Sequence, residues 1–502
     1  MISALVSRKS KFNINLRTIV LLIFIMNCVH LCAQTFNERL SFYYNSLETG
    51  MVCLEAQDHY LFMGGFYDSL GIPHSGVIAT DYGGGVIHNS IVFNDSTIYM
   101  TGYYTSATLL EDGVLSCGLF TTPPYDFTAG MLIKLDLLGD TLWTKIIPPI
   151  DGEELFPAEA FKVSDGYVVC GGSVSADGVG KGLLMKFDED GNEVWRQDYL
   201  PTSNESPIRL VSAVEIPGGG FLLGGATMAA FNWNHLVIKT DSLGNQIWRK
   251  TEGDEFSNSF AMVANTADGK YIFAGEDQNA EQFHDRSQVT KLNTNGTVAW
   301  TYYYGEEGPD CLAFSIKALD DGGFVFCGGD RSAWGTAFGY ICRIDQNGNE
   351  LWYRKYQQTA GNECFATDVS PTSDGGFIMT GLLTSNSNLN LPQDMWAIKL
   401  DSMGCLIPGC QVGIIEKGEV AAMRVYPNPA DDFINVFVES QQVGDCALHL
   451  YDLQGRELQC TTVRESGNTW MMDSATLSPG TYLLQLLVDG AVVKSEKVVV
   501  RH

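Results

Sequence analysis

Short apolar segments recur along most of this chain, and each is bounded by a turn containing Gly, Asp or Asn. The stretch from residue 311 to 356 is representative: CLAFSIKAL, then FVFCGG after a DDGG turn, then YICRID, then ELWYRKY after a QNGN turn. β-branched and aromatic residues dominate these segments, and none of them sustains the 3.6-residue period of an amphipathic helix. The pattern therefore predicts units of four short antiparallel strands and excludes a helical solenoid.

The units repeat at a constant spacing. The fragment K-x-D-x-x-G-x-x-x-W, with Arg for Lys or Asn for Asp in single copies, occurs at 134–143, 186–195, 239–248, 291–300 and 343–352, so successive tryptophans are 52 or 53 residues apart. A copy at 399–408 lacks the tryptophan, and a weak copy starts at Thr80. Four strands in a repeat of this length are typical of a β-propeller blade. A second fragment, an aromatic or aliphatic residue followed by apolar residues and Gly, occurs seven times, at 60–64, 98–102, 167–171, 221–225, 271–275, 324–328 and 377–381.

The sequence thus predicts an all-β protein whose main body is a seven-bladed propeller, within limits of six to eight blades. The seventh repeat lacks its last strand, and residues 39–44 (RLSFYY) align with the Trp strand WYRKYQ of the sixth. We expect this N-terminal strand to complete the last blade, because closing the ring removes exposed sheet edges. In the first repeat, the outer strand is expected to be short or missing.

The repeated D-x-x-G-x-x-x-W fragment resembles two known propeller motifs. It is one residue shorter than the tryptophan docking motif of quinoproteins and one residue longer than the Asp-box of sialidases. In both families the Asp and Gly shape a turn and the aromatic residue packs between blades. The resemblance implies this structural role, and no activity, for the blade tryptophans Trp143, Trp195, Trp248, Trp300 and Trp352.

The N-terminus has the layout of a secretory signal. A basic segment precedes the apolar run 19–26, and Ala33 offers a small residue at a cleavage site. We therefore expect a signal peptide at 1–33 and the propeller at 34–410. The apolar run is short for a membrane span and no later segment is longer, so no transmembrane segment is expected in the mature chain.

The repeat ends near Cys410. Residues 411–421 read as a linker, and strand spacing differs over 422–502. Here YPNPA (426–430) with FINV (433–436), LYDLQGR (450–456), LSPGTY (477–482) and KVVV (497–500) resemble, in order, the conserved blocks of type IX secretion sorting domains. The resemblance implies an immunoglobulin-like β-sandwich that an outer-membrane translocon recognises in Bacteroidetes-type bacteria. It also implies a secreted or outer-membrane cell-surface protein. A carbohydrate-binding sandwich is the alternative.

Charge and cysteine usage narrow the choice of partners. A formal net charge of −28 argues against binding nucleic acid or anionic lipid. The 13 cysteines include no CxxC pair, and two local disulfides, Cys405–Cys410 and Cys446–Cys460, are plausible in an oxidising compartment.

Sequence motifs for catalysis or for cofactor binding are missing. The chain contains no HExxH, GxSxG, P-loop or GxGxxG, so we predict no catalytic residue, metal site or cofactor. Asp188 and Asp190 resemble the first half of a calcium loop, although the related turns lack the second carboxylate and a tight turn is the simpler interpretation. Arg209, Arg286 and Arg331 are too few and too irregularly spaced to predict the arginine cluster of a sialidase.

The variable connections are the best candidates for a binding site. The DGG and DxxGN turns are short and repeated, whereas the connections after each second strand vary and should lie on the opposite face. We predict a non-enzymatic binding module for an unknown extracellular glycan, peptide or protein. A divergent propeller hydrolase or lyase acting on extracellular polysaccharide is the alternative, and a structural adhesin or loops that only pack on themselves are further possibilities. The candidate ligand-binding residues are Tyr125, Phe127, Trp233, His235, His284, Arg331 and Trp334.

Overall fold

The structure is a computed structural model of the whole chain, and it divides into two compact units, 1–406 and 407–502. In the described part of the chain, no helix has the length and hydropathy of a membrane span. The predicted signal peptide lies outside the described residues. These are 35–501 apart from 43–46, 69–70, 93–97, 102–106, 122–127, 230–231, 254–258, 279–284, 306–309, 332–336, 360–361, 386–392, 407–421, 440–445, 452–456, 459–461, 467–468 and 489–490.

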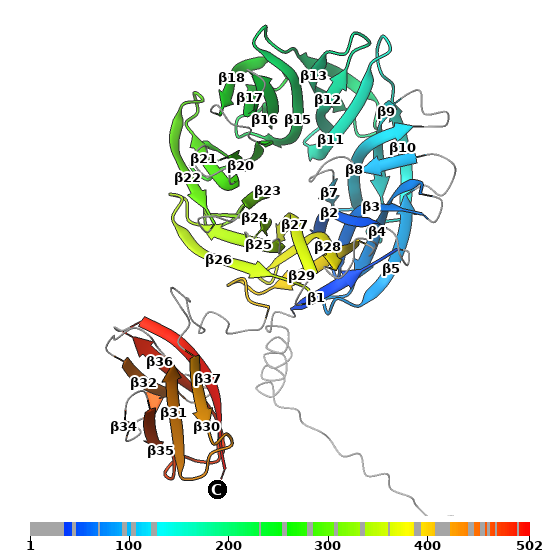
Figure 1. Cartoon of the computed structure of the whole chain (residues 1–502). Helices are drawn as coiled ribbons and strands as arrows, with labels where there is room; N and C mark the ends of the chain where they lie inside the picture. Colours follow the sequence, from blue (N-terminus) through cyan, green and yellow to red (C-terminus); the bar gives the residue numbers. More distant parts are fainter. Residues whose placement is uncertain are drawn as a thin grey trace, which may run out of the picture. The chain divides into compact units, whose positions relative to one another are not determined.

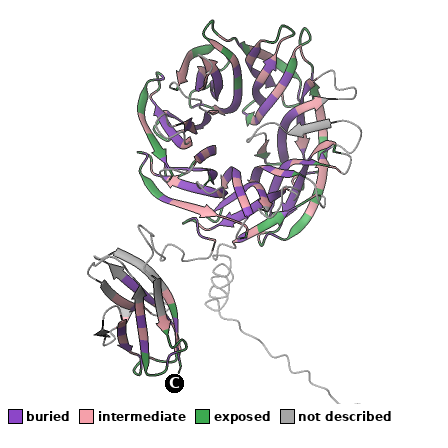
Figure 2. Ribbon diagram, in the orientation of Figure 1, coloured by how far each residue is buried: buried purple, intermediate pink, exposed green. Residues whose placement is uncertain are grey.

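The first unit is a ring of seven antiparallel sheets, which confirms the predicted propeller and its blade number for the described residues (Figure 1). Buried residues concentrate on the inner and middle strands, and the outer strands carry most exposed positions (Figure 2). Four blades have strands consecutive in sequence and complete in the repeat: β11 (Glu154–Val163), β12 (Gly166–Val174), β13 (Gly180–Phe187) and β14 (Glu193–Tyr199); β15 (Glu205–Glu215), β16 (Phe221–Ala229), β17 (Asn232–Thr240) and β18 (Gln246–Glu252); β19 (Met262–Asn265), β20 (Tyr271–Gln278), β21 (Asp285–Leu292) and β22 (Val298–Tyr304); β23 (Asp310–Ala318), β24 (Phe324–Arg331), β25 (Ala337–Ile344) and β26 (Glu350–Tyr356).

The first two repeats differ in detail from the prediction. The first blade has a complete outer strand, β5, so the expectation of a short or missing strand was wrong. In the second blade, β6 and β7 both pair with β8, so the fragment at 98–102 is not the second-strand copy; VLSCG (114–118) in β8 takes that place. The strands are β2 (Glu48–Glu55), β3 (Tyr60–Tyr67), β4 (Pro73–Thr80) and β5 (Val86–Val92), then β6 (Ile98–Thr101), β7 (Ala107–Leu110), β8 (Gly113–Thr121), β9 (Thr128–Leu135) and β10 (Thr141–Ile147).

The N-terminal strand closes the ring. β1 (Phe36–Leu40) pairs with β29 (Asp394–Leu400), beside β28 (Phe377–Ser385) and β27 (Asn362–Pro371). Phe36 lies opposite Lys399, just as Trp352 lies opposite Arg343 in the preceding blade. The predicted closure is confirmed, but its alignment was three residues off: Phe36, rather than Arg39, occupies the tryptophan position.

Each blade tryptophan packs against the turn glycine of the next blade. Gly191 and Gly244 have φ of 76° and 79°. A Cβ on Gly191 would stand 3.3 Å from the ring of Trp143, and one on Gly244 would stand 2.9 Å from Trp195. The same contact joins Trp248 to Gly296, Trp300 to Gly348 and Trp352 to Gly404, and Phe36 makes it with Gly84 where the ring closes.

A tyrosine four residues after the tryptophan reinforces three of these junctions. The hydroxyl of Tyr199 donates to the carbonyl of Gly244 at 2.7 Å, and that of Tyr304 donates to Gly348 at 2.7 Å. Tyr356 makes the equivalent bond to Gly404. The turn glycine is therefore held on its open face by an indole and at its carbonyl by a phenol.

The second unit is a sandwich of two four-stranded antiparallel sheets, β30-β31-β35-β34 and β33-β32-β36-β37, around a core that includes Ile434, Trp470 and Leu484. Asn428 ties the chain before the second strand to the last strand, because its amide donates to Lys497 O at 2.7 Å and accepts from Val499 N at 2.9 Å. The sandwich matches the predicted immunoglobulin-like fold. Its strands are β30 (Ala422–Tyr426), β31 (Phe433–Glu439), β32 (Cys446–Tyr451), β33 (Glu457–Leu458), β34 (Thr462–Ser466), β35 (Thr469–Asp473), β36 (Gly480–Val488) and β37 (Ala491–Val500).

The predicted disulfides fall partly outside the described residues. Cys405 is disulfide-bonded, and its expected partner Cys410 is not described. Cys460, the expected partner of Cys446, is not described either. Seven buried cysteines of the propeller are free thiols, which fits a packing role.

Replacing Trp352 by Ala should lower the free energy of unfolding by about 3 kcal/mol, because the ring is only 7% exposed and its loss leaves a cavity beside Gly404. Urea-induced unfolding of the full chain measures the change. The control is Leu351→Ala, whose side chain is 54% exposed and whose removal should cost no more than about 0.5 kcal/mol. Equal losses in the two variants would contradict the packing role.

Candidate functional site

Three of the seven predicted ligand-binding residues lie in the part of the chain that the structure describes. Tyr125, Phe127, His284 and Trp334 fall outside the described residues. The other three are described and lie on or beside the connections after the second strands. Trp233, the second residue of β17, is half-buried; Arg331, the last residue of β24, is exposed; and His235 is buried. Whether these residues bind a ligand stays a prediction.

His235 is packed between two blades. Its ring meets Phe273 edge-on with centroids 5.2 Å apart, and its Nε2 would stand 2.4 Å from a Cβ on Gly275. Burial lowers the pKa of His235 to about 4, so the imidazole is neutral at pH 7. In this conformation the side chain fills the junction between neighbouring blades.

Three arginines lie over aromatic rings at this end of the propeller. Arg209 on β15 lies 5.1 Å from the ring centroid of Trp233, and Arg286 at the start of β21 lies 3.8 Å from that of Tyr303. The third, Arg331, lies 5.5 Å from the ring of Phe365 on β27. First strands begin, second strands end, third strands begin and fourth strands end on the same face of a propeller, so all three pairs belong to the face of the variable loops. We call these three pairs the arginine–aromatic face.

These arginines keep donors available. Arg209 and Arg331 are exposed and have no ion-pair partner among the described residues, whereas Arg286 donates to Asp277 Oδ2 at 2.8 Å. An aromatic ring beneath a guanidinium holds it in place through cation–π attraction without occupying its donors, which lie in the plane of the group. Chemically, such a face can bind carboxylate, sulfate or phosphate groups.

A second group of polar side chains surrounds the propeller axis. A β-bulge in the innermost strand precedes Glu159, Ser212, Ser315 and Asp368 in their blades. The Glu159 carboxylate accepts from Ala213 N at 2.5 Å, the Ser212 hydroxyl from Val263 N at 3.2 Å, and Asp368 Oδ2 from Cys53 N at 3.1 Å. Ser315 donates to Asp368 Oδ1 at 2.8 Å. Each of these side chains thus bonds to the neighbouring blade.

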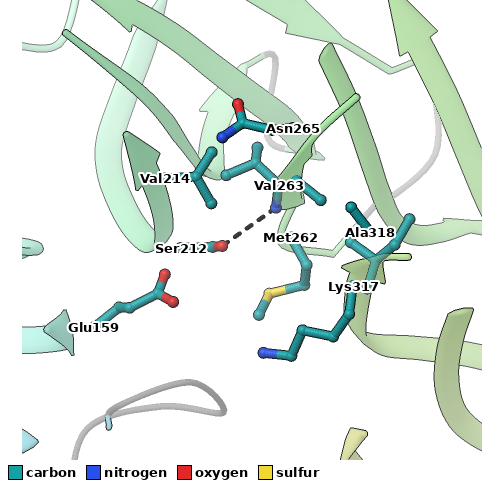
Figure 3. A pocket seen from close by; sticks show the side chains of 10 residues that line it. Glu159, Ser212, Val214, Met262, Val263, Asn265, Lys317 and Ala318 are labelled. Atoms are coloured by element: carbon teal, nitrogen blue, oxygen red, sulfur yellow. Dashed lines mark hydrogen bonds between the residues drawn. The ribbon is translucent and has the colours of Figure 1, made fainter. Parts of the chain in front are cut away.

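A cavity of about 230 Å³ lies among these strands and is lined by residues that include Glu159, Ser212 and Lys317. Figure 3 shows the carboxylate of Glu159 and the ammonium of Lys317 directed into the same space from opposite sides. Lys317 also pairs with Asp368 at 3.4 Å. The sequence-based predictions did not include these residues. Glu159 and Lys317 are more than a hundred positions apart, and the bulge that precedes Glu159 is visible only in the pairing of the strands.

The charged side chains around the propeller axis shift one another's pKa values. Burial raises the pKa of Glu159 to about 7, although the Lys317 charge and the bond from Ala213 act in the opposite direction. Burial lowers the pKa of Lys317, but the carboxylates of Asp368 and Glu159 outweigh it and raise this pKa above its ordinary value. Lys317 is therefore charged at neutral pH, and Glu159 titrates near pH 7.

The suggested calcium loop forms a tight turn. Asp188 Oδ1 accepts from the backbone N–H groups of Asp190 and Asn192 at 3.0 and 2.8 Å, and Oδ2 accepts from the Asn192 side chain at 3.0 Å. The turns at Asp241 and Asp345 make the same three bonds. Calcium at Asp188 and Asp190 stays the lesser alternative that the sequence left open.

The sandwich is assigned by its family. Residues 424–501 match the model of the secretion system C-terminal sorting domain, on the segment where the Asn428 contacts and the closing strand lie. This chain is a type IX secretion cargo. The sorting tail indicates a secreted or cell-surface protein, as the sequence motifs implied.

Solved propellers resemble the cargo's structure only distantly. The β-propeller domain of the Trilobed protease from Pyrococcus furiosus matches at 8% identity with a TM-score of 0.40, covering 71% of this chain and 94% of that one. Sqt1 from Chaetomium thermophilum matches at 9% identity with a TM-score of 0.40, covering 72% of this chain and 99% of that one. No curated protein matches the cargo chain.

The raised pKa of Glu159 predicts a pH-dependent cost to stability. Because the folded protein holds this proton more tightly than the unfolded chain does, the contribution of Glu159 becomes less favourable as pH rises from about 4.5 to about 7. Glu159→Gln removes that titration. Relative to wild type, the variant should gain on the order of 2 kcal/mol between pH 5 and pH 8.

Urea unfolding of both proteins across this pH range measures the difference. Glu189→Gln serves as the control, because its carboxylate is 66% exposed and should give a flat difference. A flat difference for Glu159→Gln as well would rule out the perturbed carboxyl group.

Proposed function

We propose that this type IX cargo is a non-enzymatic extracellular binding module, and that its ligand presents acidic groups to the arginine–aromatic face. The ligand is a glycan, peptide or protein encountered outside the cell. Export is through the outer-membrane translocon of a Bacteroidetes-type bacterium, with residues 422–502 as the recognised domain and residues 1–33 as the signal peptide.

The observation that carries this proposal is the alignment of three guanidinium–aromatic pairs on one face. Arg209, Arg286 and Arg331 lie on a first, a third and a second strand, yet all three stand at the same end of the blades. The aromatic rings hold these arginine side chains in place before a ligand binds. Less side-chain entropy is then lost on binding, which favours a higher affinity. In a chain with a net charge of −28, the guanidinium groups of Arg209 and Arg331, which no described carboxylate neutralises, favour an acidic ligand.

The alternative, a propeller hydrolase or lyase, has weaker support. Two carboxylates, Glu159 and Asp368, lie at the propeller axis. In each, one oxygen accepts a hydrogen bond from a backbone N–H of the next blade. The described basic side chain beside them is Lys317. This arrangement favours a structural role for the pair over the roles of a general acid and a nucleophile.

The double variant Arg209→Ala/Arg331→Ala should lose binding to acidic ligands by at least tenfold, because each exposed guanidinium contributes a charge-assisted contact. Arrays of acidic and neutral oligosaccharides, and of acidic and neutral peptides, probed with the full chain identify the ligand. Titration then measures the dissociation constants of wild type and variant.

Arg343→Ala is the matched control. This arginine pairs with Asp321 at the turns of the opposite face, so its loss should leave binding unchanged. Preference for neutral ligands, or equal loss from both variants, would refute the arginine–aromatic face as the binding surface.

Deletion of residues 422–502 should keep the cargo inside the cell envelope, since the deleted segment contains the sorting domain. The propeller core should remain folded, because the hydrophobic clusters of the first unit contain no residue of the tail. Fractionation of cells producing full-length and truncated chains tests export, and protease resistance of the retained protein tests folding. Efficient release of the truncated chain would contradict the role of the tail.

A further inference from the structure

The axial cavity lies at the opposite end of the propeller from the arginine–aromatic face. Its lining includes Asn265 and Ala318, the last residues of the innermost strands β19 and β23, and Val214, the last but one of β15. These strands end at the short turns into the second strands. The cavity is therefore a separate site from the one proposed above.

A carboxyl group that ionises near pH 7, that of Glu159, and the ammonium group of Lys317 face this cavity from opposite sides. No ion pair joins Glu159 to Lys317 in the described part of the propeller, although each charge shifts the pKa of the other group. The Glu159 carboxylate accepts from Ala213 N through Oε2 and also bonds to the Ser212 side chain, and a carboxylate with two such partners can still accept further hydrogen bonds. The Lys317 ammonium has three donors and one long contact to Asp368, and its side chain keeps 31% exposure.

The remaining wall combines apolar side chains with one unsatisfied acceptor. Met262, Ile316 and Val214 give an aliphatic surface. Asn265 donates to Glu215 O at 2.5 Å, but its Oδ1 is buried and has no partner among the described residues. A buried amide oxygen without a partner costs free energy, so a ligand or water that donates to it is favoured.

We propose that this cavity binds a small zwitterion of the amino-acid class, whose ammonium group pairs with Glu159 and whose carboxylate pairs with Lys317. The volume of about 230 Å³ is below the roughly 300 Å³ at which sites for drug-sized ligands begin, which favours a small molecule as the occupant. A simple cation would pair with Glu159 and leave the Lys317 ammonium with its one long contact to Asp368, and a simple anion would leave Glu159 without a cationic partner. The aliphatic wall selects a short apolar side chain.

Titration calorimetry of the full chain with α-amino acids, and with β-alanine and γ-aminobutyrate, tests the proposal. We expect at least one of these zwitterions to bind. The matching alkylamine and alkylcarboxylate, each lacking one charged group, should bind at least tenfold more weakly. The two ω-amino acids show which separation of the charges the cavity prefers.

The variants Glu159→Gln and Lys317→Met should each abolish binding of the zwitterion, while Arg209→Ala/Arg331→Ala leaves it unchanged. Failure of all the zwitterions to bind wild type overturns the inference, as does binding that survives both channel variants or equal binding of the monofunctional analogues. Because the comparison of ligands uses wild-type protein, it stands even where a variant does not fold. The unchanged double-arginine variant separates this site from the proposed binding face.

Discussion

The contact between an indole and the turn glycine of the next blade is the constraint on which the propeller depends. The glycine has positive φ, which suits Gly in the tight turn, and a Cβ there would stand within 3.3 Å of the neighbouring ring, closer than ordinary van der Waals contact. One residue thus satisfies the local turn and the packing between blades at once. At the ring closure, Phe36 supplies the aromatic surface from a strand at the other end of the domain, so this junction resembles the five that contain an indole. Between the first and second blades, Val77 instead lies against the turn glycine, Gly139.

The innermost strands add a second set of junctions with a different chemistry. Bulges turn Glu159, Ser212 and Asp368 toward backbone amides of adjacent blades, which fixes the spacing of the strands around the axis. Burying carboxylates there is costly, and Lys317 offsets part of that cost. Glu159 and Lys317 therefore take part in the contacts that stabilise the ring and also give the cavity its acidic and basic walls.

The sequence predicted the blade number, the ring closure and the sorting domain, because each depends on short fragments repeated or ordered along the chain. It misaligned the closing strand, since RLSFYY contains the same alternation of aromatic and polar residues as the Trp strands and only the pairing of Phe36 with Lys399 distinguishes the registers. It also rejected Arg209, Arg286 and Arg331 as an arginine cluster, although it named Arg331 as a candidate ligand-binding residue. Their spacing is irregular because they lie on the first, third and second strands of their respective blades. The fold nevertheless brings these strand ends to one face.

The charge state of those arginines gives the strongest physical reason to regard the face as functional. Arg39, Arg196, Arg249 and Arg343 all pair with carboxylates, as expected in a chain with 59 acidic residues. Arg209 and Arg331 instead lie over aromatic rings and have no carboxylate partner among the described residues. A ring supports a guanidinium without neutralising it. In a chain rich in acidic residues, an arginine that lies over a ring instead of pairing with a carboxylate keeps its positive charge available at the surface. Recognition of an acidic ligand requires such a charge.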